Sequence, residues 1–434
     1  MSHRKFPAFV LLFLITSCAE LPSTDNDLRN IQDSTDPAAH LHLLRQQGEQ
    51  ITGTRFMEGN KVVLLRDGAA TYPSMLASIR AARHRIDMES FTFDENEGQQ
   101  FASALLERSK AGVEVNLIYD AIGSDDTPAT LFDRMRQGGI HVLEYNPIDA
   151  ESIIDASINH RDHRKLLLID GKIAFTGGLN ISVVYRTKLK IQRLLHIQSD
   201  DLNPEQLPWR DTHIKIEGPV VAEFENLFMQ TWYSKKGEPI SAPPLTPTTY
   251  KGNLLVQAIN GTPDLNEFSI YRSLLVSIAL AQKYIYLTTA FFVPTPDLVH
   301  ALERAAQRGV QVVIILPSRT YPDLPQKAGR AYYEDLMEAG VQIYERQNAV
   351  LHAKTAVIDG VWSTVGSSNL DWRSVLFNDE CNAVILGNAF GQQMEALFQY
   401  DLTQSLYIDP QTWNDRPTLE KFDEWKARLV EYFL

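Results

Sequence analysis

The sequence predicts an α/β fold that occurs twice along the chain. Helical patterns alternate with apolar strand patterns in each half, which is typical of α/β sheets. The segment from Leu76 to Phe91 is matched by the segment from Leu275 to Thr288, and in both a helical pattern runs into a strand pattern. With 434 residues, of which 44% are apolar and 22% charged, the chain is long enough for two globular domains.

Each half continues with a helix that ends near a glycine and leads into a buried strand. In the first half Gly112 precedes the run 113–119, and in the second half Gly309 precedes the run 310–316. Glycine just past a helix is a common C-terminal cap. A third pair of matching segments follows at 138–142 and 339–343.

Proline-rich composition marks the boundary between the halves. The predicted organisation is a first domain at 51–240, a linker at 241–252, a second domain at 253–410 and a C-terminal helical tail at 411–434. In the tail, large apolar residues recur at helical spacing: Leu419, Phe422, Trp425, Leu429 and Phe433. We expect this stripe to pack on the body of the protein; contact with a membrane surface is the alternative.

The N-terminus has the pattern of an export signal. An apolar run from Phe9 to Ile15 is far shorter than the ~20 residues of a membrane-spanning helix. The next residues, Thr16-Ser17-Cys18, resemble a bacterial lipobox, so we expect a lipoprotein signal at 1–18 that ends at a lipidated Cys18. A polar tether at 19–50, with one short helix starting near Pro37, would follow. An ordinary signal peptide or a short anchor with an incidental cysteine is the alternative.

Charge and cysteine content exclude some classes of function. The formal net charge of −13 argues against a dedicated nucleic-acid binder, because neutralising phosphates needs a basic surface. Only Cys18 and Cys381 are present, so a disulfide framework is not expected. If the lipobox is correct, the protein is anchored to the cell membrane with its catalytic domains on the periplasmic, extracytoplasmic side.

The strongest chemical signal is a motif that occurs once in each half. The first copy consists of His163, Lys165 and Asp170, with Asn180 downstream. The second copy consists of His352, Lys354 and Asp359, with Asn369 downstream. The register is constant (352 − 163 = 369 − 180 = 189). A single His-x-Lys is a weak signal, whereas two full copies in one register are hard to obtain by chance.

These residue types fit phosphodiester cleavage. One histidine can attack phosphorus and form a covalent intermediate, while the other protonates the leaving alkoxide and deprotonates the incoming alcohol. Residues two apart on a strand share a face, so the histidine and lysine of each copy point the same way. The two lysines and two asparagines would bind the phosphate and stabilise charge on its oxygens. Because the lysines already supply positive charge, we expect no metal ion and no other cofactor.

Carboxylates at matching places complete the predicted site. Asp211 and Glu380 are candidates for orienting the histidines, since a neutral imidazole needs an acceptor for its second nitrogen. Asp170 and Asp359 are grouped with the catalytic residues as members of the motif. They stand seven residues from their histidines, roughly 23 Å along a strand at about 3.3 Å per residue, so we expect them to organise the following turn.

From about Glu58 to Asp401 the constellation resembles the phospholipase D superfamily, and within it the bacterial cardiolipin synthases. The segment 58–61 is similar to the start of the short forms that lack an N-terminal transmembrane hairpin. The resemblance implies two phospholipase D-like α/β domains packed about a pseudo-two-fold axis with one shared active site. It implies that His163 is the nucleophile and His352 the general acid and base.

The resemblance also implies the substrates. Phospholipids at a membrane surface would be the partners, with cardiolipin made from phosphatidylglycerol and a second phospholipid through a phosphohistidine intermediate. The alternatives are a phospholipase D hydrolase that releases phosphatidic acid, a phosphodiesterase or nuclease of the same superfamily, and a non-enzymatic tethered binding lipoprotein. The sequence leaves the oligomeric state open.

Overall fold

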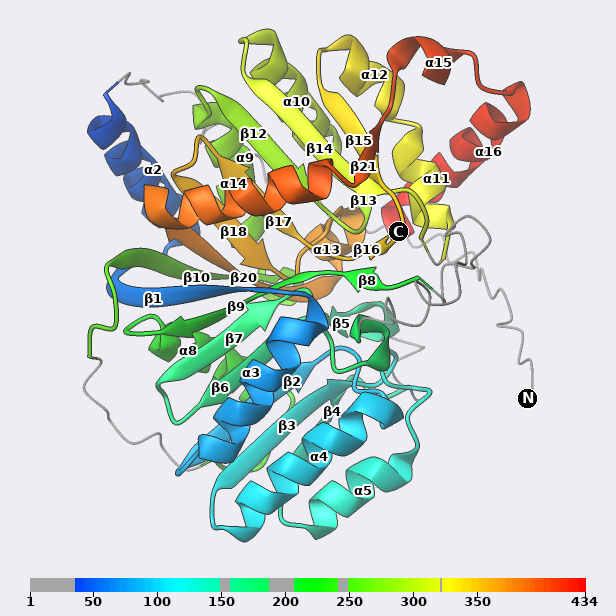
Figure 1. Ribbon diagram of the computed structural model, residues 1–434. Helices are drawn as coiled ribbons and strands as arrows, with labels where there is room; N and C mark the ends of the chain where they lie inside the picture. Colours follow the sequence, from blue (N-terminus) through cyan, green and yellow to red (C-terminus); the bar gives the residue numbers. More distant parts are fainter. Residues whose placement is uncertain (1–35, 149–156, 187–206, 241–248, 321) are drawn as a thin grey trace.

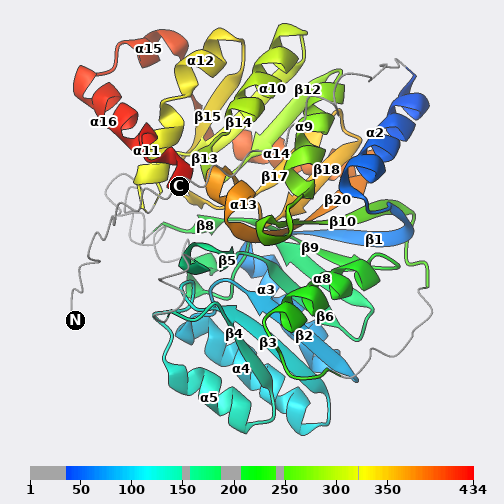
Figure 2. The ribbon, with the colours of Figure 1, turned by 180° about the vertical axis from the view of Figure 1, so that it is seen from behind.

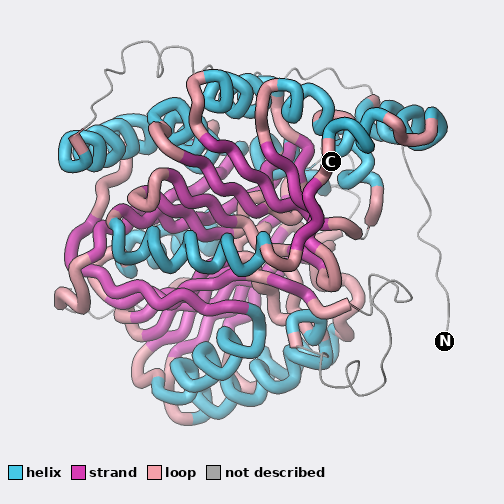
Figure 3. The backbone as a smooth tube through the Cα atoms, turned by 45° about the horizontal axis from the view of Figure 1, so that its top comes forward, coloured by secondary structure: helices cyan, strands magenta, loops and turns pink. Residues whose placement is uncertain are grey.

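The computed structural model describes residues 36–148, 157–186, 207–240, 249–320 and 322–434. They form two α/β halves, the first in the lower part of Figure 1 and the second in the upper part. Figure 3 shows the strands of both halves enclosed by helices. The predicted fold class, two similar α/β domains, is confirmed.

The first half is built on one mixed sheet. Its strands lie in the order β4 (His141–Tyr145), β3 (Glu114–Asp120), β2 (Arg85–Ser90), β6 (Lys165–Ile169), β7 (Ile173–Gly177), β9 (Thr212–Glu217) and β1 (Met57–Arg66). The pairs β4–β3 and β3–β2 are parallel and the rest antiparallel. One face is covered by α3 (Asp67–Ala81), α4 (Glu95–Lys110) and α5 (Ala129–Gln137), and the other by α8 (Val221–Ser234).

The second half repeats this sheet. Its strands lie in the order β21 (Ser405–Tyr407), β15 (Gln342–Arg346), β14 (Gln311–Pro317), β12 (Tyr284–Thr288), β17 (Thr355–Ile358), β18 (Trp362–Gly366), β20 (Asn378–Leu386) and β10 (Leu254–Thr262). The covering helices are α9 (Ser269–Leu280), α10 (Pro296–Gln307) and α12 (Tyr333–Glu338) on one face and α14 (Asn388–Leu402) on the other.

The predicted glycine caps are present at matching places. Gly112, just past α4, has φ +86°, and Gly309, just past α10, has φ +88°. This left-handed conformation strains any residue with a side chain, which explains glycine at both positions.

The two halves share one apolar core. Strand β1 pairs antiparallel with β10, so the two sheets meet edge to edge. Side chains from both sheets, including Ile216, Val365 and Ala383, belong to one buried cluster. Two short parallel ladders also cross the junction: β8 (Trp209–Arg210) pairs with β16 (Val350–Leu351), and β5 (Arg161–Asp162) with the start of β20. These ladders hold the segments that carry the predicted site.

Part of the predicted tether is a packed helix. The segment α2 (Pro37–Thr52) begins at Asp36, whose side chain accepts a hydrogen bond from the Ala39 amide at 3.1 Å. Leu44 and Ile51 are buried in the core of the second half, against α9. A short helix near Pro37 was expected, but its packing on the second domain was not. The predicted signal with Cys18, and the tether up to residue 35, lie outside the described residues.

The C-terminal tail differs from its prediction. It consists of α15 (Pro410–Asn414), α16 (Thr418–Arg428) and the short turn η6 (Glu431–Phe433). Helix α16 packs against α11 (Leu324–Arg330) through the face that carries buried Ala427. The predicted apolar stripe points away from that contact, and its five side chains are 51–71% exposed. The expectation that the stripe packs on the body is therefore wrong.

Within the described ranges, we find no helix that meets the length and hydropathy required to cross a bilayer.

Candidate active site

His163 and His352 lie at the junction of the halves, each just before an inner strand of its own sheet. The backbone amide of His163 donates to the carbonyl oxygen of Asp379 at 2.9 Å. The backbone amide of His352 donates to the carbonyl oxygen of Arg210 at 2.8 Å. Each histidine is thus fixed by a strand segment of the opposite half, and both are buried.

The orienting carboxylates are exchanged between the halves. His163 Nδ1 lies 2.9 Å from Oε1 and 3.0 Å from Oε2 of Glu380, which belongs to the second half. His352 Nδ1 lies 2.7 Å from Oδ2 of Asp211, which belongs to the first half. A carboxylate at Nδ1 keeps the proton there and leaves Nε2 free to attack or exchange protons. Neither half can orient its own histidine.

The motif lysines lie beside their histidines, as the strand spacing predicts. Lys165 Nζ donates to the backbone oxygen of His163 at 2.5 Å, and Lys354 Nζ to that of His352 at 2.7 Å. Lys354 Nζ also lies 3.0 Å from His352 Nδ1 and 3.1 Å from Nε2. Burial is the main cause that lowers the pKa of Lys165 and of His163. The charge of Lys354 lowers the pKa of Lys165 further, and the charges of both lysines lower that of His163. Two ammonium groups in one buried cluster suit a doubly coordinated anion.

Burial sets the protonation of this cluster. It lowers the pKa of His163 and of His352 well below the usual range, and the nearby lysines lower both further. Burial also lowers the pKa of Lys165 to about 7 and that of Lys354 to about 8. It raises the pKa of Glu380 to about 7. The histidines are therefore neutral imidazoles, the form that a nucleophile requires.

Hydroxyl groups that were not predicted from the sequence lie beside the two histidine–carboxylate pairs, His163–Glu380 and His352–Asp211. Glu380 accepts hydrogen bonds from Ser374 Oγ at 2.9 Å and from Ser367 Oγ at 2.5 Å. Tyr185 Oη lies 3.2 Å from His352 Nδ1. Tyr185 and Ser374 occupy matching places, since they are 189 residues apart like the histidines (374 − 185 = 189). The constant register was a signal that could have found both.

The two asparagines are placed differently. Asn180 Oδ1 accepts from the Thr92 amide at 3.2 Å, and its Nδ2 donates to Tyr185 Oη at 3.1 Å. Asn369 is equally buried, but its Oδ1 has no hydrogen-bond partner among the described residues. Because a buried carboxamide oxygen normally accepts a hydrogen bond, Asn369 Oδ1 has spare capacity for a ligand that donates, such as an alcohol hydroxyl.

Asp170 and Asp359 do not lie with the histidines. Asp170 accepts from the backbone amides of Arg83, His84 and Arg85 at 2.7–3.2 Å. Asp359 accepts from those of Gln282, Lys283 and Tyr284 at 2.8–2.9 Å. Both stand at the end of an inner strand farthest from the motif lysine and have positive φ, 52° and 53°. Their grouping with the catalytic residues is corrected: they fix the turn before β2 and β12.

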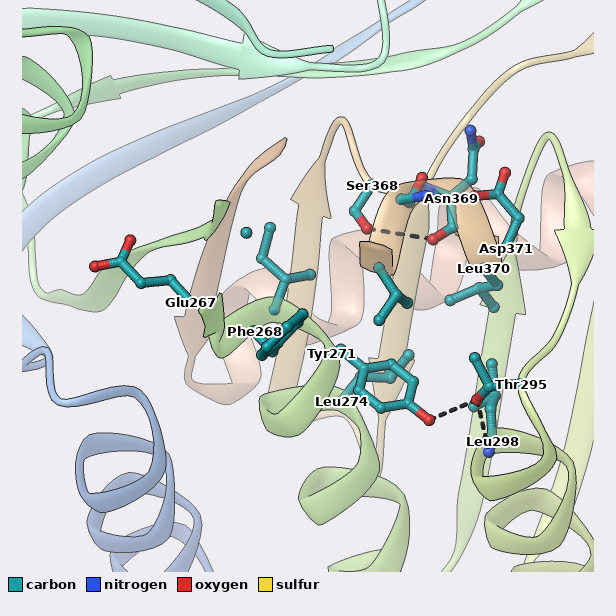
Figure 4. Close-up of a pocket in the computed structure, with 14 residues that line it drawn as sticks. Glu267, Phe268, Tyr271, Leu274, Thr295, Leu298, Ser368, Asn369, Leu370 and Asp371 are labelled. Atoms are coloured by element: carbon teal, nitrogen blue, oxygen red, sulfur yellow. Dashed lines mark hydrogen bonds between the residues drawn. The ribbon is translucent and has the colours of Figure 1, made fainter. Parts of the chain in front are cut away.

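A pocket of about 450 Å³, counted to its open mouth, lies beside Asn369 (Figure 4). Its polar wall includes Ser368, Asn369 and Asp371. The opposite wall carries Phe268 and Tyr271, and the Tyr271 hydroxyl lies 2.5 Å from Thr295 Oγ1. Neither histidine lines the pocket, but Ser374 belongs both to its wall and to the Glu380 network. The pocket therefore adjoins the site from the second half.

Comparison with known proteins assigns the family. The family model described as "Cardiolipin synthase, PLD-like domain" matches residues 75–185 and 274–402. A cardiolipin synthase of Geobacillus sp. (strain WCH70) is 32% identical over 399 residues, 91% of this chain and 76% of the relative. The chain belongs to the phospholipase D-like cardiolipin synthase family. It is thus an enzyme of the phospholipase D phosphatidyltransferase type.

Two further relatives of this family member extend the comparison. A cardiolipin synthase of Halalkalibacterium halodurans is 30% identical over 438 residues, 100% of this chain and 84% of the relative. The solved structure of phosphatidylserine synthase from Haemophilus influenzae Rd KW20 has a TM-score of 0.63 over 90% of this chain and 99% of that one. At 14% identity this second likeness concerns the fold.

Within the described ranges, no group of three or more His, Cys, Asp or Glu side chains is arranged to hold a metal ion. Cys381 is buried and has its thiol pKa raised to about 12 by burial, so it is not a reactive thiolate. The polar cluster of histidines, lysines and exchanged carboxylates is thus the chemical centre that these residues offer.

Proposed function

We propose that the protein makes cardiolipin by transferring a phosphatidyl group from one phospholipid to the glycerol hydroxyl of phosphatidylglycerol. The observation that carries this proposal is the exchange of orienting carboxylates, with Glu380 on His163 and Asp211 on His352. It prepares two imidazoles of matched geometry for opposite sides of one phosphodiester. The family of the chain supports the same class of reaction.

In the first step, His163 Nε2 attacks phosphorus and the bond to the leaving alcohol breaks. Glu380 stabilises the positive charge that develops on the attacking imidazole. His352 takes up a proton on Nε2 from solvent when the charge of the bound phosphodiester raises its pKa, and it gives this proton to the leaving alkoxide. The products of the step are a phosphatidyl-histidine and a free alcohol, which is glycerol when phosphatidylglycerol is the donor.

In the second step, the hydroxyl of the acceptor lipid attacks the phosphatidyl-histidine. His352, now neutral, takes the hydroxyl proton and His163 leaves phosphorus. A bound phosphodiester adds negative charge beside the lysines and therefore raises the pKa of His352 above its low substrate-free value. This charge lets one histidine act as acid before transfer and as base during it.

Lys165, Lys354 and the Nδ2 group of Asn369 hold the non-bridging oxygens in this proposal, because these oxygens accept hydrogen bonds and only Nδ2 of the carboxamide donates. Asn180 is tied to Tyr185 and serves the phosphate only through its remaining donor capacity. The apolar wall of the pocket beside Asn369 offers contact to the lipid portion nearest the phosphate, although the enclosed cavity holds only about 30 Å³.

The test uses protein without residues 1–18, incubated with phosphatidylglycerol vesicles and analysed by lipid mass spectrometry. Cardiolipin together with glycerol, absent in His163→Ala, is the expected result. Phosphatidic acid without cardiolipin would contradict transfer and indicate that water is the acceptor. Cleavage of DNA without any lipid product would point to a nuclease, and an unchanged lipid pool to a binding protein.

We also propose that Cys18 is lipidated and holds the catalytic halves on the extracytoplasmic side of the cell membrane. The support is the Thr16-Ser17-Cys18 pattern after a short apolar run. Metabolic labelling with a radioactive fatty acid should mark the full chain, and Cys18→Ser should abolish the label. Equal labelling of both chains would contradict this anchor.

A further inference from the structure

The C-terminal tail carries an apolar surface that covers nothing in the structure. Its five members, which we call the tail stripe, are Leu419, Phe422, Trp425, Leu429 and Phe433. They include the most exposed large apolar side chain of the described residues, Leu419 at 71%. Phe422 and Trp425 stack with their ring centroids 5.8 Å apart. Such a concentration within fifteen residues, Leu419 to Phe433, is unusual for a surface that faces only water.

The opposite face of the same helix is fixed to the protein. Ala427 is buried with Val293 and Ala328, and Glu424 is buried and paired with Arg416 Nη2 at 2.6 Å. The stripe therefore keeps a fixed direction and cannot fold back onto the core. A rigid, outward-facing apolar helix is the form that interfacial membrane helices take.

The tail is joined to the site by short contacts. The backbone oxygen of Leu434 accepts from the Arg373 amide at 3.1 Å, and Tyr432 packs on Trp372 and Phe377. Ser374, which follows Arg373 in the chain, donates to Glu380, and Glu380 in turn orients His163. Figures 1 and 2 both show the C-terminus beside β13 (Phe292–Val293) at the junction of the halves. The C-terminal end of the tail thus lies beside α13 (Trp372–Leu376), which borders the site, whereas α16 extends away from it along the outer edge of the second half (Figure 1).

We propose that the tail stripe docks the enzyme on the surface of a phospholipid bilayer, so that the site meets its lipid substrates there. This inference rests on the proposed function, since a phosphatidyltransferase must draw two lipids from a bilayer. The lipidated Cys18 would hold the protein near the membrane, whereas the stripe would set its orientation. Two weak attachments of this kind are what stable membrane binding requires.

The charges around the stripe permit an anionic bilayer. Although the protein carries −13, residues 416–434 contain four basic and four acidic side chains. The acidic side chains are largely paired: Asp423 with Lys426 at 2.6 Å and Glu431 with Arg428 at 3.5 Å. Lys426 also lies 4.9 Å from the centre of the Phe422 ring. An anionic bilayer would repel the negatively charged remainder of the protein, but it would not repel this neutral, aromatic-rich surface.

The docking arm of the test uses a fluorescent label and no turnover. Without residues 1–18, the chain retains only buried Cys381, so a cysteine introduced at Leu429 reacts selectively. An environment-sensitive label on Leu429→Cys should shift to the blue with phosphatidylglycerol vesicles and be quenched by a lipid-borne quencher. The matched control is Lys110→Cys, an exposed position at the far end of α4, which should show neither effect.

The activity arm compares two forms of substrate. Replacing Leu419, Phe422, Trp425 and Leu429 together by glutamine should lower the rate on vesicles at least tenfold and leave the rate on monomeric short-chain phosphatidylglycerol unchanged. The control replaces two exposed leucines elsewhere, Leu265 and Leu406, and should behave as the unmodified enzyme on both.

Three outcomes would overturn docking. The first is that the four-glutamine variant binds vesicles as well as the unmodified chain. The second is that the fluorescence of the label on Leu429→Cys does not shift with vesicles. The third is that the unmodified chain is a dimer, which the four substitutions convert to a monomer with no change in vesicle binding. The last would assign the stripe to a second copy of the chain. If the unmodified enzyme makes no product from either substrate, the proposed reaction fails, while the label still decides the docking.

Discussion

Replacing the two orienting carboxylates by their amides, Glu380→Gln and Asp211→Asn, should have unequal costs. Both oxygens of Glu380 face hydroxyl groups, Ser367 and Ser374, which can rotate to accept from an amide NH₂. The glutamine can therefore turn its oxygen to His163 and preserve the tautomer. What is lost is the charge of the acceptor, worth about 1–1.5 kcal/mol, or roughly tenfold in kcat.

Asp211 has no such freedom. Its Oδ1 accepts from the Thr212 amide at 2.7 Å, a donor that cannot rotate, while Oδ2 faces His352. An asparagine that keeps the Thr212 bond presents its NH₂ to His352 Nδ1. That histidine must then carry its proton on Nε2 and cannot take one from the acceptor hydroxyl. We expect a loss of kcat on the order of 10³-fold or more, as for a wrong tautomer in other histidine–carboxylate pairs.

Steady-state turnover of phosphatidylglycerol measures both losses, and thermal unfolding confirms that each variant folds. Asp211→Asn should also accumulate a phosphatidyl group on the peptide that contains His163, detected by mass spectrometry after an alkaline quench. Equal losses in the two variants, or the greater loss in Glu380→Gln, would refute the reasoning. A phosphatidyl group on His352 would reverse the assigned roles.

Other perturbations test the surroundings of the same cluster. The kcat/KM profile should be a narrow bell. It rises through pH about 7 as Glu380 and Asp211 lose protons, and it falls from about 7 to 8 as Lys165 and then Lys354 lose theirs, so a flat profile from 6 to 9 would contradict these pKa values. In Gly178→Ala the new Cβ would stand 2.2 Å from Asp211 Oδ1, so we expect at least a tenfold lower kcat. Ser367 stands at the matching place in the second half. Ser367→Ala removes one donor to Glu380 and should cost about 1 kcal/mol, which lowers kcat roughly fivefold. Tyr185→Phe removes the hydroxyl that lies beside His352 and accepts from Asn180. The loss of these hydrogen bonds, about 1 kcal/mol, should lower kcat five- to tenfold without a change in KM. Unchanged kinetics would show that the hydroxyl is only structural.

The sequence was sufficient to predict the repeated sheets and the pairing of each motif histidine with its lysine. Alternating patterns predicted the inner strands, and the two-residue spacing predicted that Lys165 shares a face with His163. The distance along the strand also predicted that Asp170 lies away from His163, but not that its carboxylate accepts from three backbone amides of the turn before β2. These features depend on residues close together in the chain, so the periodicity and spacing of the sequence can predict them.

What the sequence could not predict depends on which surfaces meet. Asp211 and Glu380 were found as a pair, but their exchange between the halves follows from two-residue ladders at β5 and β8, too short to have a period. In the tail, the spacing of Leu419 and Trp425 defines one apolar face but not whether that face turns inward. Similarly, α2 reads as polar, and only its contact with α9 explains why Leu44 is buried.

The exchange of carboxylates makes the enzyme indivisible. In the proposed mechanism, a change at Glu380 in the second half impairs the nucleophile of the first, and a change at Asp211 in the first half impairs the acid and base of the second. If the repeat arose by duplication of a single-motif chain, that ancestor needed two copies assembled face to face before it could catalyse anything. Fusion would then have secured a partnership that already existed.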